Sequence, residues 1–121
     1  MHVCCLGVGS PTVVLDSGLS DSWLSWHRVQ PDVAQFTRVC SYDRAGLGWS
    51  DPSPRSRTSK VFAEELHTLL QHANIAPPYI LVGHSMGGYD VRVFTKAYPR
   101  EVVGWFWLMR LIPIYLSDCR N

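Results

Sequence analysis

The stretch that most constrains the fold is YILVGHSMGGYDV, residues 79–91, in which an apolar run leads directly into a serine flanked by glycines. Residues 79–83 are suited to a strand of a parallel sheet that is buried on both faces. Residues 86–98 are predicted to form a helix, which Pro99 ends. The sequence therefore predicts a sharp strand-to-helix turn with Ser85 at its apex.

Gly83 and Gly87 lie two residues on either side of Ser85 and complete the pattern G-x-S-x-G. A serine on such a turn has strained backbone angles, and glycine removes the Cβ atoms that would collide there. The first amides of the following helix would point at the place where negative charge develops during acyl transfer. With a strand before it and a helix after it, the pattern predicts that Ser85 is a nucleophile.

Strands and helices alternate along the rest of the chain. Strands are expected at residues 2–7, 11–18, 37–43 and 79–83, and helices at 22–36, 59–73 and 86–98, the first of them interrupted at Pro31. Residues 44–57 are rich in glycine and proline and are expected to form a loop. The alternation predicts an α/β fold, in which a mostly parallel sheet has flanking helices, over a single domain of residues 1–121.

Composition limits the partners of the chain. The 121 residues are 46% hydrophobic with a formal net charge of +1, as in soluble globular proteins. This charge attracts neither nucleic acid nor an anionic membrane, and the short basic cluster at 54–60 is expected to be a solvated loop. The longest apolar run, residues 104–116, is interrupted by Arg110 and Pro113 and is shorter than the ~20 residues of a bilayer span. We therefore expect neither nucleic acid nor a membrane as a partner.

The cysteines give no sign of a metal site. Cys4, Cys5, Cys40 and Cys119 lack paired C-x-x-C spacing, and no signal peptide is recognised ahead of them. No glycine-rich dinucleotide or phosphate pattern follows a strand either. We therefore expect no metal and no other cofactor, and we expect buried, reduced thiols in a cytoplasmic protein.

Three motifs, in order, resemble the serine-type α/β-hydrolase superfamily. TVVLDSG at 12–18 resembles its strand and oxyanion turn, and LVGHSMGG at 81–88 resembles its nucleophile elbow. YDRAGLGWSD at 42–51 resembles the family loop D-x-R-G-x-G-x-S, with an alanine inserted before the first glycine. The likeness covers residues 2–104, and the tail at 105–121 is atypical.

The resemblance implies roles for the residues around the turn. Ser85 would attack a small-molecule substrate with an ester or amide-type bond, and the backbone amides of Met86 and Leu19 would form the oxyanion hole. Asp43 and Arg44 match positions that brace a loop, so they are expected to be structural. The substrate cannot be named, because the cap that shapes the pocket in this family normally follows the elbow unit.

A base for Ser85 is not found where the family order, serine then acid then histidine, requires it. All five histidines lie before Ser85: His2, His27, His67, His72 and His84. His84 is adjacent, but neighbouring side chains on an extended strand point to opposite sides. His27 is the best-placed substitute, because its predicted helix begins at the oxyanion turn.

The acids after Ser85 are Asp90, Glu101 and Asp118. Asp90 is expected in the helix after the nucleophile and Glu101 in the turn before the next strand, and neither is the position of a triad acid. Loss of the triad histidine costs about 10⁶ in turnover. We therefore expect little or no activity from this chain.

The tail suggests a reason for the missing base. Its aromatic residues, followed by Arg110 and Pro113, make a poor buried parallel strand. Because tryptophan and phenylalanine have few codons, a shifted reading of residues 104–107 necessarily encodes an apolar run. We expect that a single-base change near codon 104 has shifted the frame, so that the C-terminal strands are missing; the alternative is a genuine short variant. The nucleotide sequence downstream tests this.

Two classes of function remain open. One is a serine hydrolase, or an acyltransferase with the same elbow, and the other is a non-catalytic truncated fragment or binding module. Truncation would leave the strand at 79–83 near an exposed sheet edge, where unpaired amides invite association. We therefore also expect self-association through this edge.

Overall fold

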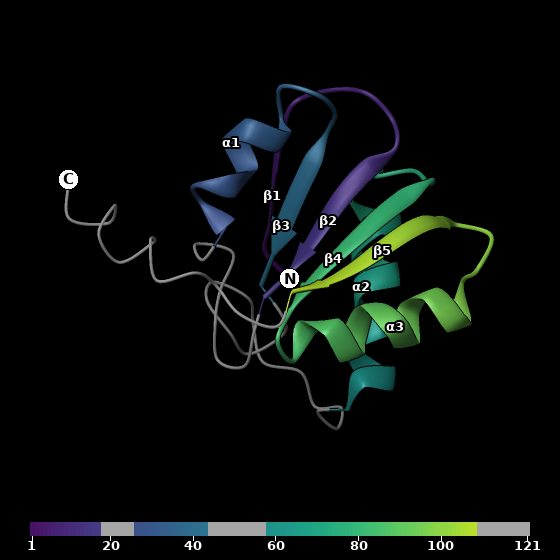
Figure 1. Ribbon diagram of the computed structural model, residues 1–121. Helices are drawn as coiled ribbons and strands as arrows, with labels where there is room; N and C mark the ends of the chain where they lie inside the picture. The colour runs from purple at the N-terminus through teal and green to yellow at the C-terminus, as the bar shows by residue number, and fades with distance from the viewer. Residues whose placement is uncertain (18–25, 44–57, 109–121) are drawn as a thin grey trace.

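The computed structural model describes residues 1–17, 26–43 and 58–108 (Figure 1). Within these ranges one sheet has the strand order β1-β3-β2-β4-β5. Strands β2 to β5 run parallel to one another, and β1 runs antiparallel to β3. The strands are β1 (Val3–Leu6), β2 (Thr12–Asp16), β3 (Val39–Tyr42), β4 (Tyr79–His84) and β5 (Val102–Leu108), and the helices are α1 (Val29–Val33), α2 (Ser59–His72) and α3 (Gly87–Ala97). The predicted α/β fold with a mostly parallel sheet is confirmed.

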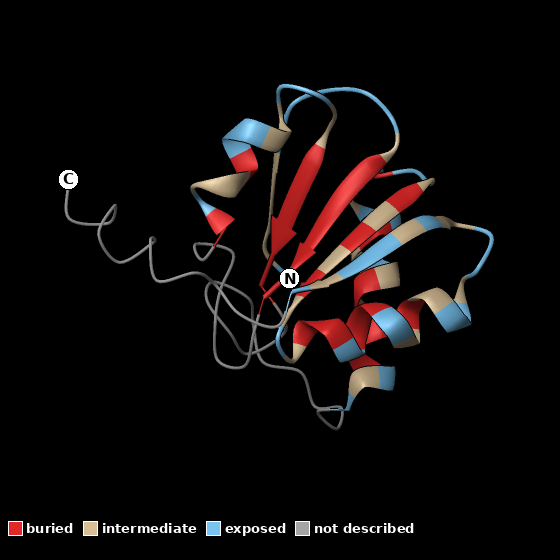
Figure 2. Ribbon diagram, viewed as in Figure 1, coloured by how far each residue is buried: buried red, intermediate tan, exposed pale blue. Residues whose placement is uncertain are grey.

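The core lies on both faces of the sheet (Figure 2). On one face, α2 and α3 bury a cluster that includes Val14, Leu66, Leu81 and Phe94. On the other face, Trp26 and the residues of α1 cover Leu15 and its neighbours. Successive residues of β2 and β4 therefore supply the two clusters alternately, as expected for interior strands of a parallel sheet.

Helix α2 matches the helix predicted at residues 59–73 closely. The hydroxyl of Thr58 accepts a hydrogen bond from the Val61 amide at 3.3 Å and so caps the helix. Three apolar residues of the helix, Val61, Leu66 and Leu70, are buried. This helix therefore covers, together with α3, the cluster that contains Val14 and Leu81.

Helix α1 differs from the prediction. The expected helix at 22–36 was to break or restart at Pro31, but α1 begins at Val29 and contains Pro31 within its first turn. Proline is tolerated there because the first amides of a helix have no acceptor inside the helix. Residues 22–25 lie outside the described ranges.

Strand β5 corrects the expectation for the tail. The tail from residue 105 was expected to make a poor buried parallel strand, yet its residues 105–108 belong to β5, which pairs with β4 along its length. The side chains remain poorly covered: Val103 is 62% exposed and Phe106 is 59% exposed. Strand β4 therefore lies inside the sheet, between β2 and β5, and β5 is the edge.

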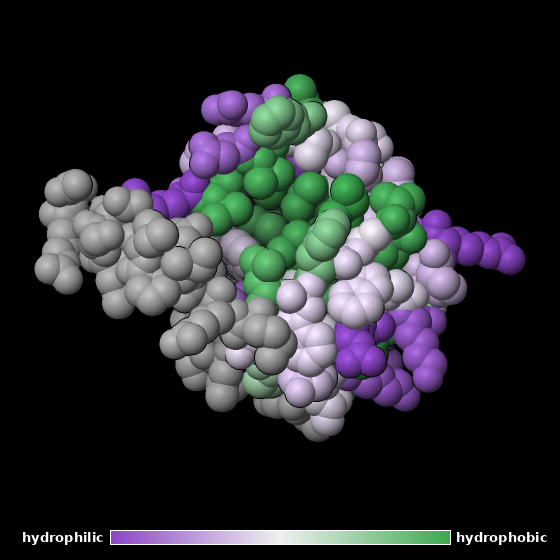
Figure 3. Space-filling view, viewed as in Figure 1, coloured by the Kyte–Doolittle hydropathy of each residue, from purple (hydrophilic) through white to green (hydrophobic). Residues whose placement is uncertain are grey.

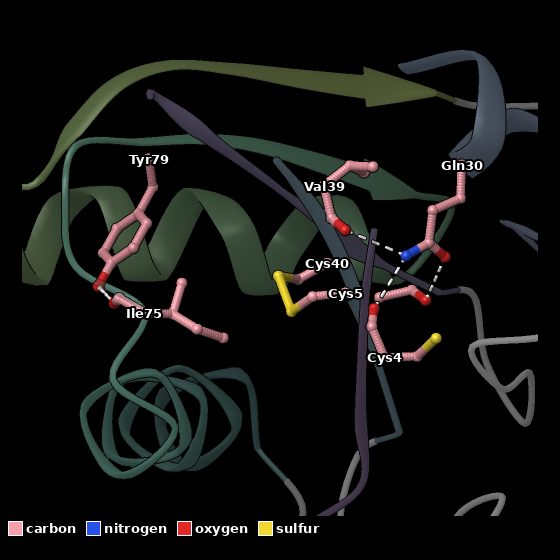
Figure 4. The surroundings of a disulfide bond; sticks show 8 residues. Cys4, Cys5, Gln30, Val39, Cys40, Ile75 and Tyr79 are labelled. Carbon is pink, nitrogen blue, oxygen red and sulfur yellow. Dashed lines mark hydrogen bonds between the residues drawn. A yellow bond between two sulfur atoms is a disulfide. The ribbon is translucent and has the colours of Figure 1, made fainter. Parts of the chain in front are cut away.

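The expectation of reduced thiols is wrong for one pair. Cys5 and Cys40 form a disulfide between β1 and β3 (Figure 4). The two residues are direct partners in the antiparallel ladder, with Cα atoms 4.1 Å apart, which brings their side chains together. Among the described residues Cys4 has a free thiol, and Cys119 lies outside them.

Buried Gln30 ties α1 to the same two strands. Its side-chain amide donates to the carbonyls of Cys4 at 2.8 Å and Val39 at 3.1 Å, and its oxygen accepts from the Ser41 hydroxyl at 2.7 Å (Figure 4). The short helix is thus held by hydrogen bonds as well as by apolar contacts. No helix in the described ranges is both long and apolar enough to cross a bilayer.

Candidate active site

Ser85 lies between the end of β4 and the start of α3, at the carboxyl end of the parallel strands. Its φ angle is 53°, in the left-handed region that residues with a side chain seldom occupy. This is the sharp turn that the sequence predicts. A residue with a hydroxyl group thus lies, in a strained conformation, at the carboxyl ends of the strands, where open α/β folds bind ligands.

The two flanking glycines are required by close backbone contacts. A Cβ on Gly83 would lie 2.4 Å from the carbonyl oxygen of Gly87. A Cβ on Gly87 would lie 2.6 Å from the carbonyl oxygen of Asp16 and 2.7 Å from that of Ser17. The start of α3 is therefore pressed against the end of β2, and no side chain fits between them.

This contact places the end of β2 beside the start of α3, where one of the two predicted oxyanion donors lies. Met86 occupies the N-cap position of α3, so its amide belongs to the positive end of the helix. Leu19, the other predicted donor, lies outside the described residues, which end before it at Ser17.

Strand β5 holds the main chain of Ser85 on both sides. The Ser85 amide donates to the carbonyl of Leu108 at 2.7 Å. The Ser85 carbonyl accepts from the indole Nε1 of Trp107 at 2.9 Å and from the Gly88 amide at 3.0 Å. The sequence reasoning missed Trp107 and Leu108, because they belong to the tail that it set aside as atypical.

No imidazole of the described residues hydrogen-bonds to the Ser85 hydroxyl. His84 points to the α1 side of the sheet, where its ring meets the edge of Trp26 with centroids 6.4 Å apart. Its Nδ1 is buried without a hydrogen-bond partner in the described ranges. His27, the best-placed substitute by sequence, is exposed in the turn before α1.

The remaining histidines face other groups. His67 Nε2 lies 2.8 Å from Glu101 Oε2, and Glu101 precedes β5 at the end of the sheet opposite Ser85. Seven residues of β5 separate the two ends, about 20 Å in an extended strand. His72 is exposed at the last turn of α2.

A histidine–carboxylate pair that the sequence did not reveal lies at the same end of the sheet as Ser85. His2 Nδ1 is 3.0 Å from Asp43 Oδ2, and the Asp43 side chain is fully buried. These residues extend β1 and β3, however, and β1 is three strands away from β4. At about 4.8 Å per strand, His2 is about 14 Å from the turn, too far to act on Ser85 directly.

Of the other acids that follow Ser85, Asp90 is 2% exposed and lies within α3. Asp118 lies outside the described residues, as does Arg44, the residue expected to be structural. A buried hydrogen bond of 2.7 Å joins the hydroxyl of Tyr42 to Asp16 Oδ2 below the turn. Among described residues the arrangement therefore provides a strained serine and a helix start, but no proton acceptor in contact with the serine.

Comparison with known proteins places the chain in a family. Residues 11–104 match the family model described as alpha/beta hydrolase fold. The chain is 31% identical over 115 residues to the uncharacterized protein YqjL of Bacillus subtilis strain 168, covering 95% of this chain and 44% of that protein. It is 34% identical over 104 residues to an AB hydrolase superfamily protein of Gibberella zeae, covering 81% of this chain and 32% of that protein.

Solved structures share the fold. A marine microorganism esterase superposes with a TM-score of 0.81 at 21% identity, over 98% of this chain and 48% of that one. The epoxide hydrolase CorEH gives a TM-score of 0.81 at 25% identity, over 98% of this chain and 45% of that one. The chain thus spans less than half the length of these relatives.

Proposed function

This chain belongs to the α/β-hydrolase fold family, and from that premise we propose that Ser85 is a nucleophile directed at the carbonyl of an ester or amide-type substrate. The observation that carries the proposal is the φ angle of 53° at Ser85, a strained conformation between a strand and a helix. Such strain persists only where the surroundings enforce it, and it clusters at functional sites. Here Gly83, Gly87 and β5 enforce it.

In this proposal the hydroxyl oxygen of Ser85 bonds to the substrate carbonyl carbon and gives its proton to water, while the electron pair of the C=O π bond moves onto the carbonyl oxygen, where negative charge develops. The backbone amide of Met86, at the start of α3, donates to that oxygen. We propose the amide of Leu19 as the second donor, from the resemblance of residues 12–18 to the strand and oxyanion turn of the family; the close approach of Gly87 to the Ser17 carbonyl, two residues before Leu19, supports this. Donors fixed in this way stabilise the charge without reorganising as it forms.

We further propose that this chain, on its own, turns over substrate slowly. The reason is that no imidazole in the described ranges contacts the Ser85 hydroxyl, and all five histidines precede it in the chain. A serine site without its histidine retains about 10³–10⁴ over water from the oxyanion hole and binding. The second candidate function, a non-catalytic fragment or binding module, is favoured by the same observation.

A fluorophosphonate probe separates the two functions. We expect slow covalent labelling of the chain at a single serine, lost in Ser85→Ala. Labelling that persists in Ser85→Ala, or no labelling above that of the unfolded chain, would refute the nucleophile. Labelling at the rate of an intact serine hydrolase would instead show a working base and overturn the expectation of slow turnover.

A further inference from the structure

We propose that Trp107 is a positioning residue for the serine turn, acting through its indole N–H on the peptide group that carries the Met86 amide. The inference rests on the proposed function of Ser85 and goes beyond it, since it gives a role to the strand that follows the helix.

The first step is the pair of hydrogen bonds from β5 to Ser85. The Ser85 amide donates to the carbonyl of Leu108 at 2.7 Å, and the Ser85 carbonyl accepts from Trp107 Nε1 at 2.9 Å. These two groups belong to the two peptide planes on either side of the Ser85 Cα. Because φ and ψ are rotations of those planes, the two bonds together hold the left-handed conformation of Ser85.

The second step concerns the direction of the Met86 amide. The carbonyl of Ser85 and the N–H of Met86 lie in one planar peptide group and point in opposite directions. A donor that fixes the carbonyl therefore also fixes the direction in which the N–H points. A hydrogen bond accepted by the carbonyl also polarises the peptide group, which strengthens its N–H as a donor.

The third step is the space that α3 leaves for the indole ring. A Cβ on Gly88 would lie 2.2 Å from Trp107 Cδ1 and 2.3 Å from its Nε1, so only glycine admits the ring at this position. The Tyr89 ring meets the indole edge-to-face with centroids 4.8 Å apart, and the Arg92 guanidinium lies 5.7 Å from its centroid. The indole is thus held between β5 and the first turns of α3.

Trp105 provides a matched control. It pairs with Leu81 as Trp107 pairs with Gly83, so both indoles face the α3 side of the sheet. Arg92 lies 6.0 Å from its ring centroid, close to the value for Trp107. Of the two indoles, that of Trp107 alone donates to the Ser85 carbonyl, which also accepts from the Gly88 amide.

The test compares Trp107→Phe with Trp105→Phe in the full chain. Trp107→Phe keeps an aromatic ring beside Gly88 and removes the donor. We expect it to lower the second-order rate constant of fluorophosphonate labelling roughly 3- to 10-fold, the range that one neutral hydrogen bond contributes. Trp105→Phe should stay within about 2-fold of the parent chain, and both variants should melt cooperatively.

Amide hydrogen exchange by NMR gives a readout that does not depend on labelling. In Trp107→Phe we expect a shifted Met86 amide resonance and roughly 3- to 10-fold faster exchange of the Ser85 amide, with neither change in Trp105→Phe. Unchanged exchange and an unchanged Met86 resonance in Trp107→Phe would overturn the positioning role. If the parent chain is not labelled while these changes appear, the proposed nucleophile fails and the positioning of the turn stands.

Discussion

The phenolic hydroxyl of Tyr79 donates to the carbonyl of Ile75 at 2.6 Å, inside the cluster beneath α2 and α3. Tyr79 begins β4 and is 2% exposed, so this bond fixes the end of the sheet opposite Ser85. Burial, and to a smaller extent the carboxylate of Glu101, raises the pKa of Tyr79 to about 12. The phenol is therefore protonated at neutral pH and is a structural donor.

This raised pKa predicts alkaline destabilisation. Because the folded-state pKa of about 12 exceeds the ordinary value of 10.0, the folded chain holds its proton more tightly than the unfolded chain. The contribution is present in full below pH 10 and is lost as the pH rises towards 12, with a total of about 2–3 kcal/mol. The free energy of unfolding, measured in urea between pH 9 and about 12, should therefore decrease as the pH rises through this range. In Tyr79→Phe the fall should be smaller, and an equal fall in both chains would contradict the assignment.

His67 should stabilise the same end of the molecule through two separable contacts. Its ring stacks on Tyr98 with centroids 3.8 Å apart and planes inclined by 5°, and its Nε2 is 2.8 Å from the Glu101 carboxylate. We expect His67→Ala to lower the free energy of unfolding by about 1–2 kcal/mol, since the pair is only partly shielded from water. His67→Phe keeps the stack and should lose less.

His72→Ala is the control for this prediction, because His72 is exposed on the same helix and should change stability by less than about 0.5 kcal/mol. Fluorophosphonate labelling should be the same in the parent chain and the His67 variants. A large loss of labelling in His67→Phe would show that His67 acts on the serine turn after all.

Glycines of this chain should differ sharply in their tolerance of a methyl group. In Gly87→Ala the new Cβ would meet the backbone of Asp16 and Ser17 at 2.6 and 2.7 Å, and backbone atoms cannot move aside cheaply. We expect a loss of about 2 kcal/mol or more in stability, together with loss of Ser85 labelling. In Gly104→Ala nothing lies within 4 Å of the new Cβ, so stability should stay the same or rise by up to about 1 kcal/mol. Equal melting temperatures for the two variants would contradict the close packing of the turn.

Local signals predicted the parts of the fold that depend on neighbouring residues. The helix predicted at residues 59–73 depends on apolar positions a few residues apart, and the structure has α2 over Ser59–His72. The turn at Ser85 is similarly local, since strand, glycines and helix follow one another directly.

The contacts that could not be predicted from the sequence depend on the register in which distant segments pair. Cys5 and Cys40 meet because β1 pairs with β3 in one particular register, and so do His2 and Asp43. Trp107 looks unsuitable for a parallel strand until the space beside Gly88 is known. Each of these contacts joins residues about 20 to 40 positions apart, and no local pattern specifies such a contact.

We propose that the chain self-associates through strand β5, and not through β4 as the sequence led us to expect. It is the edge of the sheet, and its seven residues, VVGWFWL, contain neither charge nor proline, the usual protections of an edge strand. Figure 3 shows hydrophobic side chains gathered on the face of the sheet between α1 and β5. We expect concentration-dependent dimers by sedimentation, shifted to monomer by Val103→Lys, since a charge on an edge strand opposes pairing.

Phe36→Lys is the control, an equally drastic change at a residue that is 85% exposed beyond α1, and it should leave the dimer intact. A parent chain that sediments as a monomer at all concentrations would refute pairing through this edge, and dissociation by Phe36→Lys instead of Val103→Lys would move the interface to the α1 side.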